Sequence, residues 1–220
     1  MKVLKLAILF LIIFNMQTFS QSSLDLKLMF LSLHPVKDMR QPDTKIYENS
    51  IDNNGNLIKC PGIIFEYNKY FYLTTWSFQF TQGVFVDAIA NLAGFTHLLL
   101  DYKLYHKKKI AVNIGLGPGL SYRQSWFNNN RYVPNDKYAI NGDIQTKWFL
   151  ASELDFNYYV GKRLDVNLSL LSGHEYGTVS INFGMRYWVN SIVKFKDCNT
   201  CKKKYRRGGG FKLWWKKLWH

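Results

Sequence analysis

Three neighbouring residues could carry out hydrolytic or acyl-transfer chemistry. Ser172, His174 and Glu175 lie in the segment LSGHEYG and offer a hydroxyl, an imidazole base and a carboxylate that could orient the imidazole. Sequence proximity is the only feature that links them, and a histidine in a surface loop more often serves as an ordinary polar side chain. We keep these three residues as candidates for catalysis and assign no reaction to them.

Cysteine is the other residue type that could hold a metal or a cofactor. Cys198 and Cys201 form one C-x-x-C motif, and Cys60 stands alone in what we expect to be a long loop. Structural zinc usually needs four ligands. Covalent haem needs a histidine directly after the second cysteine, where Lys202 stands. We therefore expect no metal site and no cofactor, and a local Cys198–Cys201 disulfide stays open.

The formal net charge of +14 is concentrated at the C-terminus. Residues 191–220 contain ten Lys or Arg and one acid, and they end in the segment FKLWWKKLWH. Lysines interleaved with tryptophans suit an anionic membrane surface or an acidic groove on a partner protein. We predict that lipid or protein is bound by Lys202, Lys203, Lys204, Arg206, Arg207, Phe211, Trp214, Trp215, Lys216, Lys217 and Trp219.

The first 20 residues have the pattern of a secretory signal peptide. Two lysines precede an apolar run at residues 6–14, and Thr18 and Ser20 fit the small-x-small rule for cleavage before Gln21. The run is too short to cross a bilayer as a helix. We expect residues 1–20 to be removed during export, which excludes nucleic acid as a partner. Residues 21–190 should form one domain, followed by the tail at residues 191–220.

Alternation of apolar and polar side chains dominates the rest of the chain and predicts strands with two different faces. In residues 110–123, for example, Ile114 and Leu116 alternate with Asn113 and Gly115. Eight such segments occur, at residues 24–30, 63–67, 71–80, 96–105, 110–123, 150–160, 164–170 and 178–189. Many are close to the roughly 9–11 residues with which a tilted strand crosses a bilayer.

The predicted connections alternate between long and short. The long ones are residues 34–61, 81–95, 124–146 and 172–177, and the short ones lie near residues 68–69 and at 106–109 and 161–163. Long loops at one end and short turns at the other are the pattern of outer-membrane barrels. The nearly uncharged segment 81–95 could fold as a lid over the barrel mouth or meet a partner.

The two faces separate a membrane barrel from a soluble one. A soluble secreted barrel would turn its apolar face inward and carry Lys and Glu outside, but here the polar face is rich in Gly, Ser and Asn, which suits a narrow lumen. Strand ends carry aromatic residues typical of membrane interfaces, namely Tyr67, Tyr72, Tyr105, Tyr122, Trp126, Trp148, Tyr158 and Tyr187. We predict an all-β fold, an eight-stranded up-and-down antiparallel transmembrane β-barrel with a basic, Trp-rich C-terminal tail.

Charged residues on the polar face should point into the lumen. An eight-stranded barrel has an interior just wide enough for side chains to fill it, and buried charges are tolerated when they are paired and hydrogen-bonded. We therefore predict a lumen ionic network made of Asp25, Lys27, Glu66, Asp101, Lys103, Arg123, Glu153, Asp155, Asp165 and Arg186.

The signal peptide and the segments IAVNIGLGPGLSYR and VSINFGMRYWV resemble those of the small eight-stranded outer-membrane β-barrel proteins of Gram-negative bacteria, particularly the Bacteroidota. The resemblance covers residues 22–190 and implies the fold and an outer-membrane location. Barrels of this size include lipid A deacylases and palmitoyl transferases. This sequence lacks the His-x-Ser-Asn motif of the deacylases, and no motif allows the transferase residues to be placed on it.

These observations favour a structural or accessory outer-membrane protein in contact with outer-membrane lipid and lipopolysaccharide. We expect it to dock to other outer-membrane or periplasmic proteins, as a subunit of a larger secretion or biogenesis assembly, through its tail or long loops. The alternative is a lipid A-modifying enzyme, either a deacylase or an acyltransferase.

Overall fold

The computed structural model of the protein describes residues 21–33, 49–51, 56–71, 75–107, 109–126, 138–161, 163–173 and 178–189. These residues contain strands β1 (Ser22–Leu33), β2 (Leu57–Phe71), β3 (Trp76–Val86), β4 (Leu92–Lys107), β5 (Ile110–Gln124), β6 (Ala139–Asn141), β7 (Ile144–Tyr159), β8 (Leu164–Ser172) and β9 (Val179–Trp188). No helix in this part of the chain has the length and apolarity needed to cross a membrane. The predicted signal peptide and basic tail lie outside the described residues.

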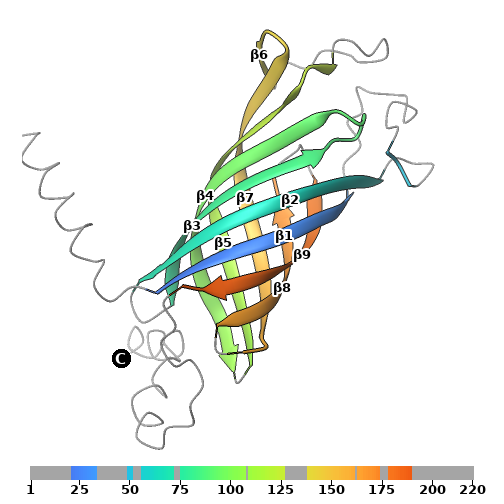
Figure 1. The fold of residues 1–220 in the computed structure, drawn as a ribbon. Coiled ribbons are helices and arrows are strands. Elements are labelled where there is room, and N and C mark those ends of the chain that lie inside the picture. Colours follow the sequence, from blue (N-terminus) through green and yellow to red (C-terminus); the bar gives the residue numbers. More distant parts are fainter. Residues whose placement is uncertain are drawn as a thin grey trace, which may run out of the picture.

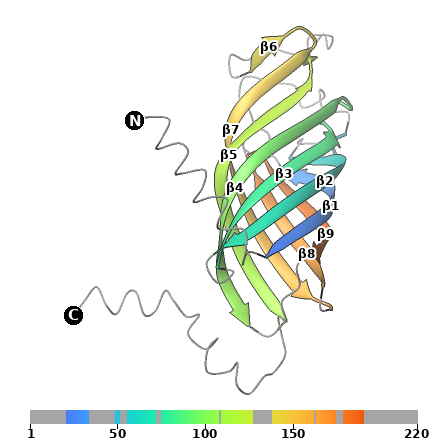
Figure 2. The ribbon, with the colours of Figure 1, turned by 60° about the vertical axis from the view of Figure 1, so that its left-hand side comes forward.

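Eight of the nine strands close into an antiparallel barrel (Figures 1 and 2). Neighbouring strands pair in chain order, and the barrel closes through the pairing of β5 with β7 and of β1 with β9. The short strand β6 pairs with the start of β7, where β7 also pairs with the end of β5. The predicted eight-stranded up-and-down antiparallel barrel is confirmed.

The two ends of the barrel carry different connections. The end that we call the loop end holds residues 34–56, 87–91, 125–143 and 173–178, and the turn end holds residues 72–75, 108–109 and 160–163. The chain enters β1 and leaves β9 at the turn end. Each loop-end connection is longer than its neighbours at the turn end, as predicted, although several lengths differ from the prediction.

Side chains alternate between the inside and the outside of the barrel along every long strand. In β1, Lys27 is fully buried, whereas its neighbours Leu26 and Leu28 are 57% and 44% exposed on the outer surface. The same alternation runs through β5 and β9. The predicted division into an apolar outer face and a polar inner face is therefore confirmed.

The turn between β2 and β3 lies further along the chain than predicted. Asn68 suggested a turn near residues 68–69, but β2 continues to Phe71 and β3 begins at Trp76. Asn68 lies between its partners Ser23 and Gln79, and its amide donates to Asp25 at 3.4 Å. That prediction is wrong because ladder pairing and an inward hydrogen bond outweigh the turn propensity of asparagine.

The predicted lid does not extend over residues 81–95, although Asp87, Ala88 and Ile89 at its centre are buried. Most of the segment is strand, and only residues 87–91 connect β3 to β4. Phe85 and Phe95 point inward and pack together with ring centroids 6.0 Å apart, so the apolar character of this segment reflects burial inside the barrel. Two other loops are shorter than predicted: β7 begins at Ile144, and β2 begins early enough to include Cys60 as a buried strand residue.

One aromatic residue that was predicted to lie at the membrane interface, Trp126, points into the barrel. Trp126 is buried, and its indole N–H donates to the carboxylate of Asp87 at 2.7 Å. The same carboxylate accepts the backbone N–H groups of Ile89 and Asn91 at the barrel mouth. This hydrogen bond holds the indole inside the barrel and away from the outer surface. Of the other predicted aromatics, Tyr122 is half-buried and Tyr72 lies outside the described residues. The remainder are exposed on the outer surface: Tyr67, Tyr105, Trp148, Tyr158 and Tyr187.

Barrel closure at the β1–β9 seam depends on a glycine. A Cβ atom at Gly184 would overlap the carbonyl oxygen of Leu26 and the side chain of Lys27. We expect Gly184→Val to lower the free energy of unfolding by about 1–3 kcal/mol, as overpacking usually does, measured from the urea midpoint in detergent micelles. Gly161→Val is the control because a Cβ there meets nothing within 4 Å. Equal midpoints for the two variants would contradict this account of the seam.

Candidate functional site

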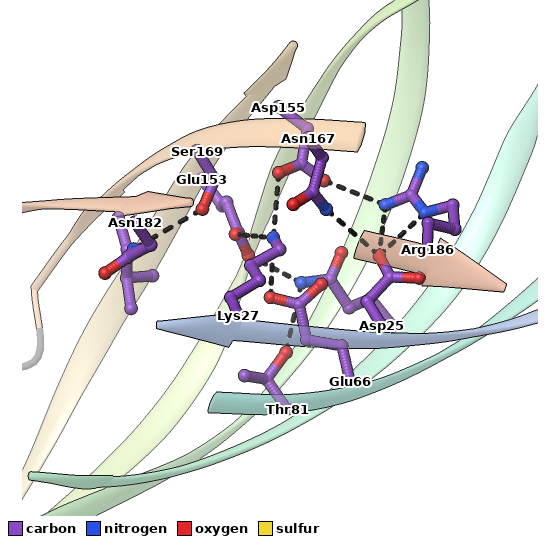
Figure 3. Close-up of polar contacts among 12 residues, drawn as sticks. Asp25, Lys27, Glu66, Thr81, Glu153, Asp155, Asn167, Ser169, Asn182 and Arg186 are labelled. Atoms are coloured by element: carbon purple, nitrogen blue, oxygen red, sulfur yellow. Dashed lines mark hydrogen bonds and ion pairs between the residues drawn. The ribbon is translucent and has the colours of Figure 1, made fainter. Parts of the chain in front are cut away.

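Three carboxylates from two strands converge on one lysine at the centre of the barrel (Figure 3). The Nζ of Lys27 in β1 lies 2.6 Å from Oε1 of Glu66 in β2, and 2.6 Å from Oε1 of Glu153 and 2.9 Å from Oδ1 of Asp155, both in β7. All four side chains are buried. The lysine therefore links β1 to its neighbour β2 and to β7, which is not adjacent to β1 in the sheet.

A second cation extends this cluster toward the turn end. Arg186 in β9 donates from Nε to Oδ2 of Asp25 at 2.7 Å, and its Nη2 lies 2.6 Å from the same oxygen. The same Nη2 donates to Oδ2 of Asp155 at 3.1 Å. Asp155 thus accepts from both Lys27 and Arg186, and it joins their two groups into a single network (Figure 3).

The geometry also shows what a cation would find in this cluster. One ligand atom each from Glu66, Glu153 and Asp155 lies within 4.8 Å of the others, which is a spacing that could hold a metal ion. The ammonium group of Lys27 lies in contact with all three carboxylates. The protein therefore supplies the cation of this cluster from its own chain, which suits a structural role.

Four members of the predicted network lie apart from this cluster. Asp101 accepts a hydrogen bond from Ser77 at 3.4 Å, and Lys103 lies 5.6 Å from the centroid of the Tyr70 ring. Asp165 accepts the indole N–H of Trp188.

Arg123 lies near the loop end. Its guanidinium carbon lies 3.7 Å from the centroid of the Trp126 ring and 4.0 Å from that of Tyr138, and its Nε donates to Gln145 at 2.9 Å. The structure thus brings together six of the ten predicted residues, namely Asp25, Lys27, Glu66, Glu153, Asp155 and Arg186.

Amide side chains that were not among the predicted members add hydrogen bonds to the network. Gln79 donates to Glu153 at 2.5 Å, while Asn68 and Asn167 donate to Oδ2 of Asp25 at 3.4 and 3.5 Å. The cluster holds four carboxylates and two cations, so these neutral donors supply hydrogen bonds that the cations do not. Their inward position in the strand pattern was the available signal, but it does not reveal which acid each one meets.

Apolar and aromatic layers close the lumen on both sides of the network. Toward the loop end, a cluster of buried residues contains Met29, Ile58, Cys60, Ile64, Phe85, Ala88, Ile89, Ala93, Phe95, Trp126 and Leu171. Toward the turn end, Tyr70 stacks on Trp188 with ring centroids 4.9 Å apart, beside Ala111 and Tyr159. The interior is therefore layered along the barrel axis, with charge in the middle and packed rings and aliphatic groups at either end.

Of the three candidate catalytic residues, Ser172 alone lies within the part of the chain that the structure describes. Ser172 is half-buried at the end of β8 and pairs with Val179 and Ser152. His174 and Glu175 lie outside the described residues, as do Cys198, Cys201 and all of the predicted binding residues of the tail. Those predictions remain untested.

Comparisons with known proteins add similarities of low identity. No protein-family model and no curated protein matches the chain. It is similar to Neisserial surface protein A, with 8% identity over 76% of this chain and 96% of that one, at a TM-score of 0.46.

Two further solved structures are similar at the same level. Ail, the attachment invasion locus protein of Yersinia pestis, is 12% identical over 77% of this chain and 97% of its own, at a TM-score of 0.44. The N-terminal β-barrel domain of Pseudomonas aeruginosa OprF is 13% identical over 77% and 98%, also at 0.44. Similarities this low transfer no function to this chain, and the barrel assignment rests on its own strand pairing.

The buried lysine provides a test of the network. We expect Lys27→Met to lower the free energy of unfolding by about 3–5 kcal/mol, because removal of one partner leaves buried charges uncompensated. Lys69→Met, on the half-exposed outer face of β2, should change it by less than about 0.5 kcal/mol. Urea titrations in detergent micelles would measure both. Adding Glu66→Gln and Glu153→Gln to Lys27→Met should recover part of the loss, and equal effects of the two single variants would contradict the assignment.

Proposed function

We propose that this protein is an outer-membrane β-barrel of the Bacteroidota type with a structural or accessory role, which docks to a larger secretion or biogenesis assembly. The observation that carries the proposal is the outer surface of the closed barrel. Each of its eight strands exposes a large apolar side chain there, including Leu26, Ile63, Phe78, Leu98, Leu116, Leu150, Leu168 and Met185. Soluble monomers rarely expose apolar patches of more than a few hundred Å², whereas a hydrocarbon environment favours such a surface.

The edges of this apolar surface support the same environment. Tyr105, Tyr158 and Tyr187 are exposed near the turn end, and Trp148 is 75% exposed near the loop end. Aromatic side chains of this kind are enriched where a barrel meets the two interfaces of a membrane. An export signal at residues 1–20 would bring the chain to the outer membrane.

The interior supports an accessory role over transport. Lys27 and Arg186 bind carboxylates across the lumen, and packed layers lie on both sides of them. An eight-stranded barrel filled in this way offers no wide path for a solute. We infer that function lies at the ends of the barrel, in its long loop-end connections and in the basic tail.

The tail provides the second surface for docking. The chain leaves β9 at the turn end, so residues 191–220 are attached there. These 30 residues contain ten cations, and the last ten of them contain one phenylalanine and three tryptophans. In an outer-membrane barrel this end faces the periplasm. Basic and aromatic side chains at that position suit an acidic protein groove or an anionic lipid surface.

Labelling of single cysteines tests membrane insertion and orientation. In a background with Cys60, Cys198 and Cys201 replaced by serine, Asp143→Cys at the loop end should react with an impermeant maleimide on intact cells. Gly161→Cys at the turn end should react only after the outer membrane is permeabilised. Labelling of both positions on intact cells, or the reverse pattern, would contradict the proposed topology.

Truncation tests the docking role of the tail. A chain that ends at Val193 should still give the heat-modifiable band of a folded barrel in the membrane fraction, but it should lose co-purifying partner proteins. Replacement of Trp214, Trp215 and Trp219 by alanine should have a similar effect, because buried tryptophans are common interface anchors. If the truncated protein keeps every partner, the loop-end connections provide the docking surface. Failure to insert would make the tail part of the assembly signal.

A further inference from the structure

We propose that the turn end of the barrel carries a cationic collar that binds the phosphate headgroups of anionic phospholipids. The collar consists of Lys107 at the end of β4, Lys109 in the β4–β5 turn and Arg163 in the β7–β8 turn. All three side chains are exposed. This inference rests on the proposed membrane location and assigns a ligand class to one end of the barrel.

Within the part of the chain that the structure describes, no acidic side chain is exposed at the turn end. The sequence contains no Asp or Glu at residues 67–86, 102–135 or 156–164, which include all three turn-end connections and the strand ends beside them. The nearest acid in sequence, Asp165, is fully buried and accepts the indole N–H of Trp188 inside the barrel. The loop end differs, because the exposed Asp143 lies there together with the exposed Lys59.

Backbone hydrogen bonds hold the two basic turns against the barrel. The carbonyl oxygen of Lys109 accepts from the backbone N–H of Tyr159 in β7 at 2.8 Å, and that of Arg163 accepts from the N–H of Trp188 in β9 at 2.9 Å. Each turn is thus bonded to a strand beyond its own hairpin. The backbone positions of Lys109 and Arg163 are therefore defined by the sheet.

Two of the three cations contact tyrosines of the outer surface. The Nζ of Lys109 lies 5.9 Å from the centroid of the Tyr158 ring, and Nη1 of Arg163 donates to the hydroxyl of Tyr187 at 3.3 Å. Both rings are almost half exposed on the face that carries the apolar side chains. The ammonium group of Lys109 and the guanidinium group of Arg163 therefore lie at the level of the exposed tyrosines.

This arrangement matches a lipid headgroup. Interfacial tyrosines mark the depth at which headgroups begin, and a lysine or arginine at that depth meets phosphate oxygens at short range. Arginine offers two parallel donors to one phosphate, and lysine offers a compact charge. Anionic phospholipids such as phosphatidylglycerol carry this phosphate without a compensating ammonium group, so the collar should prefer them to zwitterionic lipids.

The lipid preference of the inserted full-length protein tests the inference. The protein is reconstituted in phosphatidylcholine vesicles with a trace of spin-labelled phosphatidylglycerol or phosphatidylcholine, and electron spin resonance gives the relative association of each lipid with the barrel. We expect the wild type to prefer phosphatidylglycerol. The double variant Lys109→Gln, Arg163→Gln should lower this preference. If each cation contributes about 1 kcal/mol, the relative association constant falls about fivefold for each cation removed. Lys59→Gln removes an exposed cation near the loop end and should leave the preference unchanged.

The tail is present in every sample, so its contribution cancels in the comparison. An unchanged preference in the Lys109/Arg163 variant, or an equal fall in both variants, would overturn the collar. The variant Lys107→Gln with Lys109→Gln, which keeps the Arg163–Tyr187 hydrogen bond, should show the same direction of change. A wild type that inserts but has no preference would also overturn it and would leave an acidic protein as the partner of this end. A wild type without a heat-modifiable, membrane-inserted form would instead overturn the proposed function.

Discussion

A charge inside a narrow barrel has neither lipid nor bulk water to solvate it, so it needs partners from other strands. Lys27 meets this constraint with Glu66, Glu153 and Asp155, and Asp155 also accepts from Arg186. These contacts connect β1, β2, β7 and β9, which include strands on opposite sides of the lumen. A shift in the register of one strand would remove one partner and leave the other charges buried without compensation. The network therefore favours one register for all four strands.

The same constraint explains the composition of the two faces. A shift of one residue in β1 would point Lys27 outward and bring Leu26 or Leu28 into the charged layer, since successive side chains in a strand face opposite sides. Long charged side chains also need space next to them. Gly184 lies beside Lys27 and Gly115 beside Asp101, where any larger side chain would overlap the charged one. Glycine on the inner face therefore belongs to the ionic network as much as the acids do.

Local alternation made the strands and the inward residues predictable, whereas the partners of each charge were not. Lys27 and Glu153 are 126 positions apart, and their meeting depends on the stagger of the closed sheet. Local cues also failed where the tertiary structure opposed them. Asn68 favoured a turn but serves as an inward donor to Asp25, and Trp126 resembled an interface anchor until the position of Asp87 was known.

The lumen and the outer charge of the barrel have a common origin. All six acidic residues within the strands are buried in the interior: Asp25, Glu66, Asp101, Glu153, Asp155 and Asp165. These six acids outnumber the inward cations Lys27, Lys103, Arg123 and Arg186. Among the described residues, Lys107, Lys109 and Arg163 are exposed cations at the turn end, where the tail of residues 191–220 is attached. The barrel therefore separates an acid-rich interior from exposed cations at its turn end.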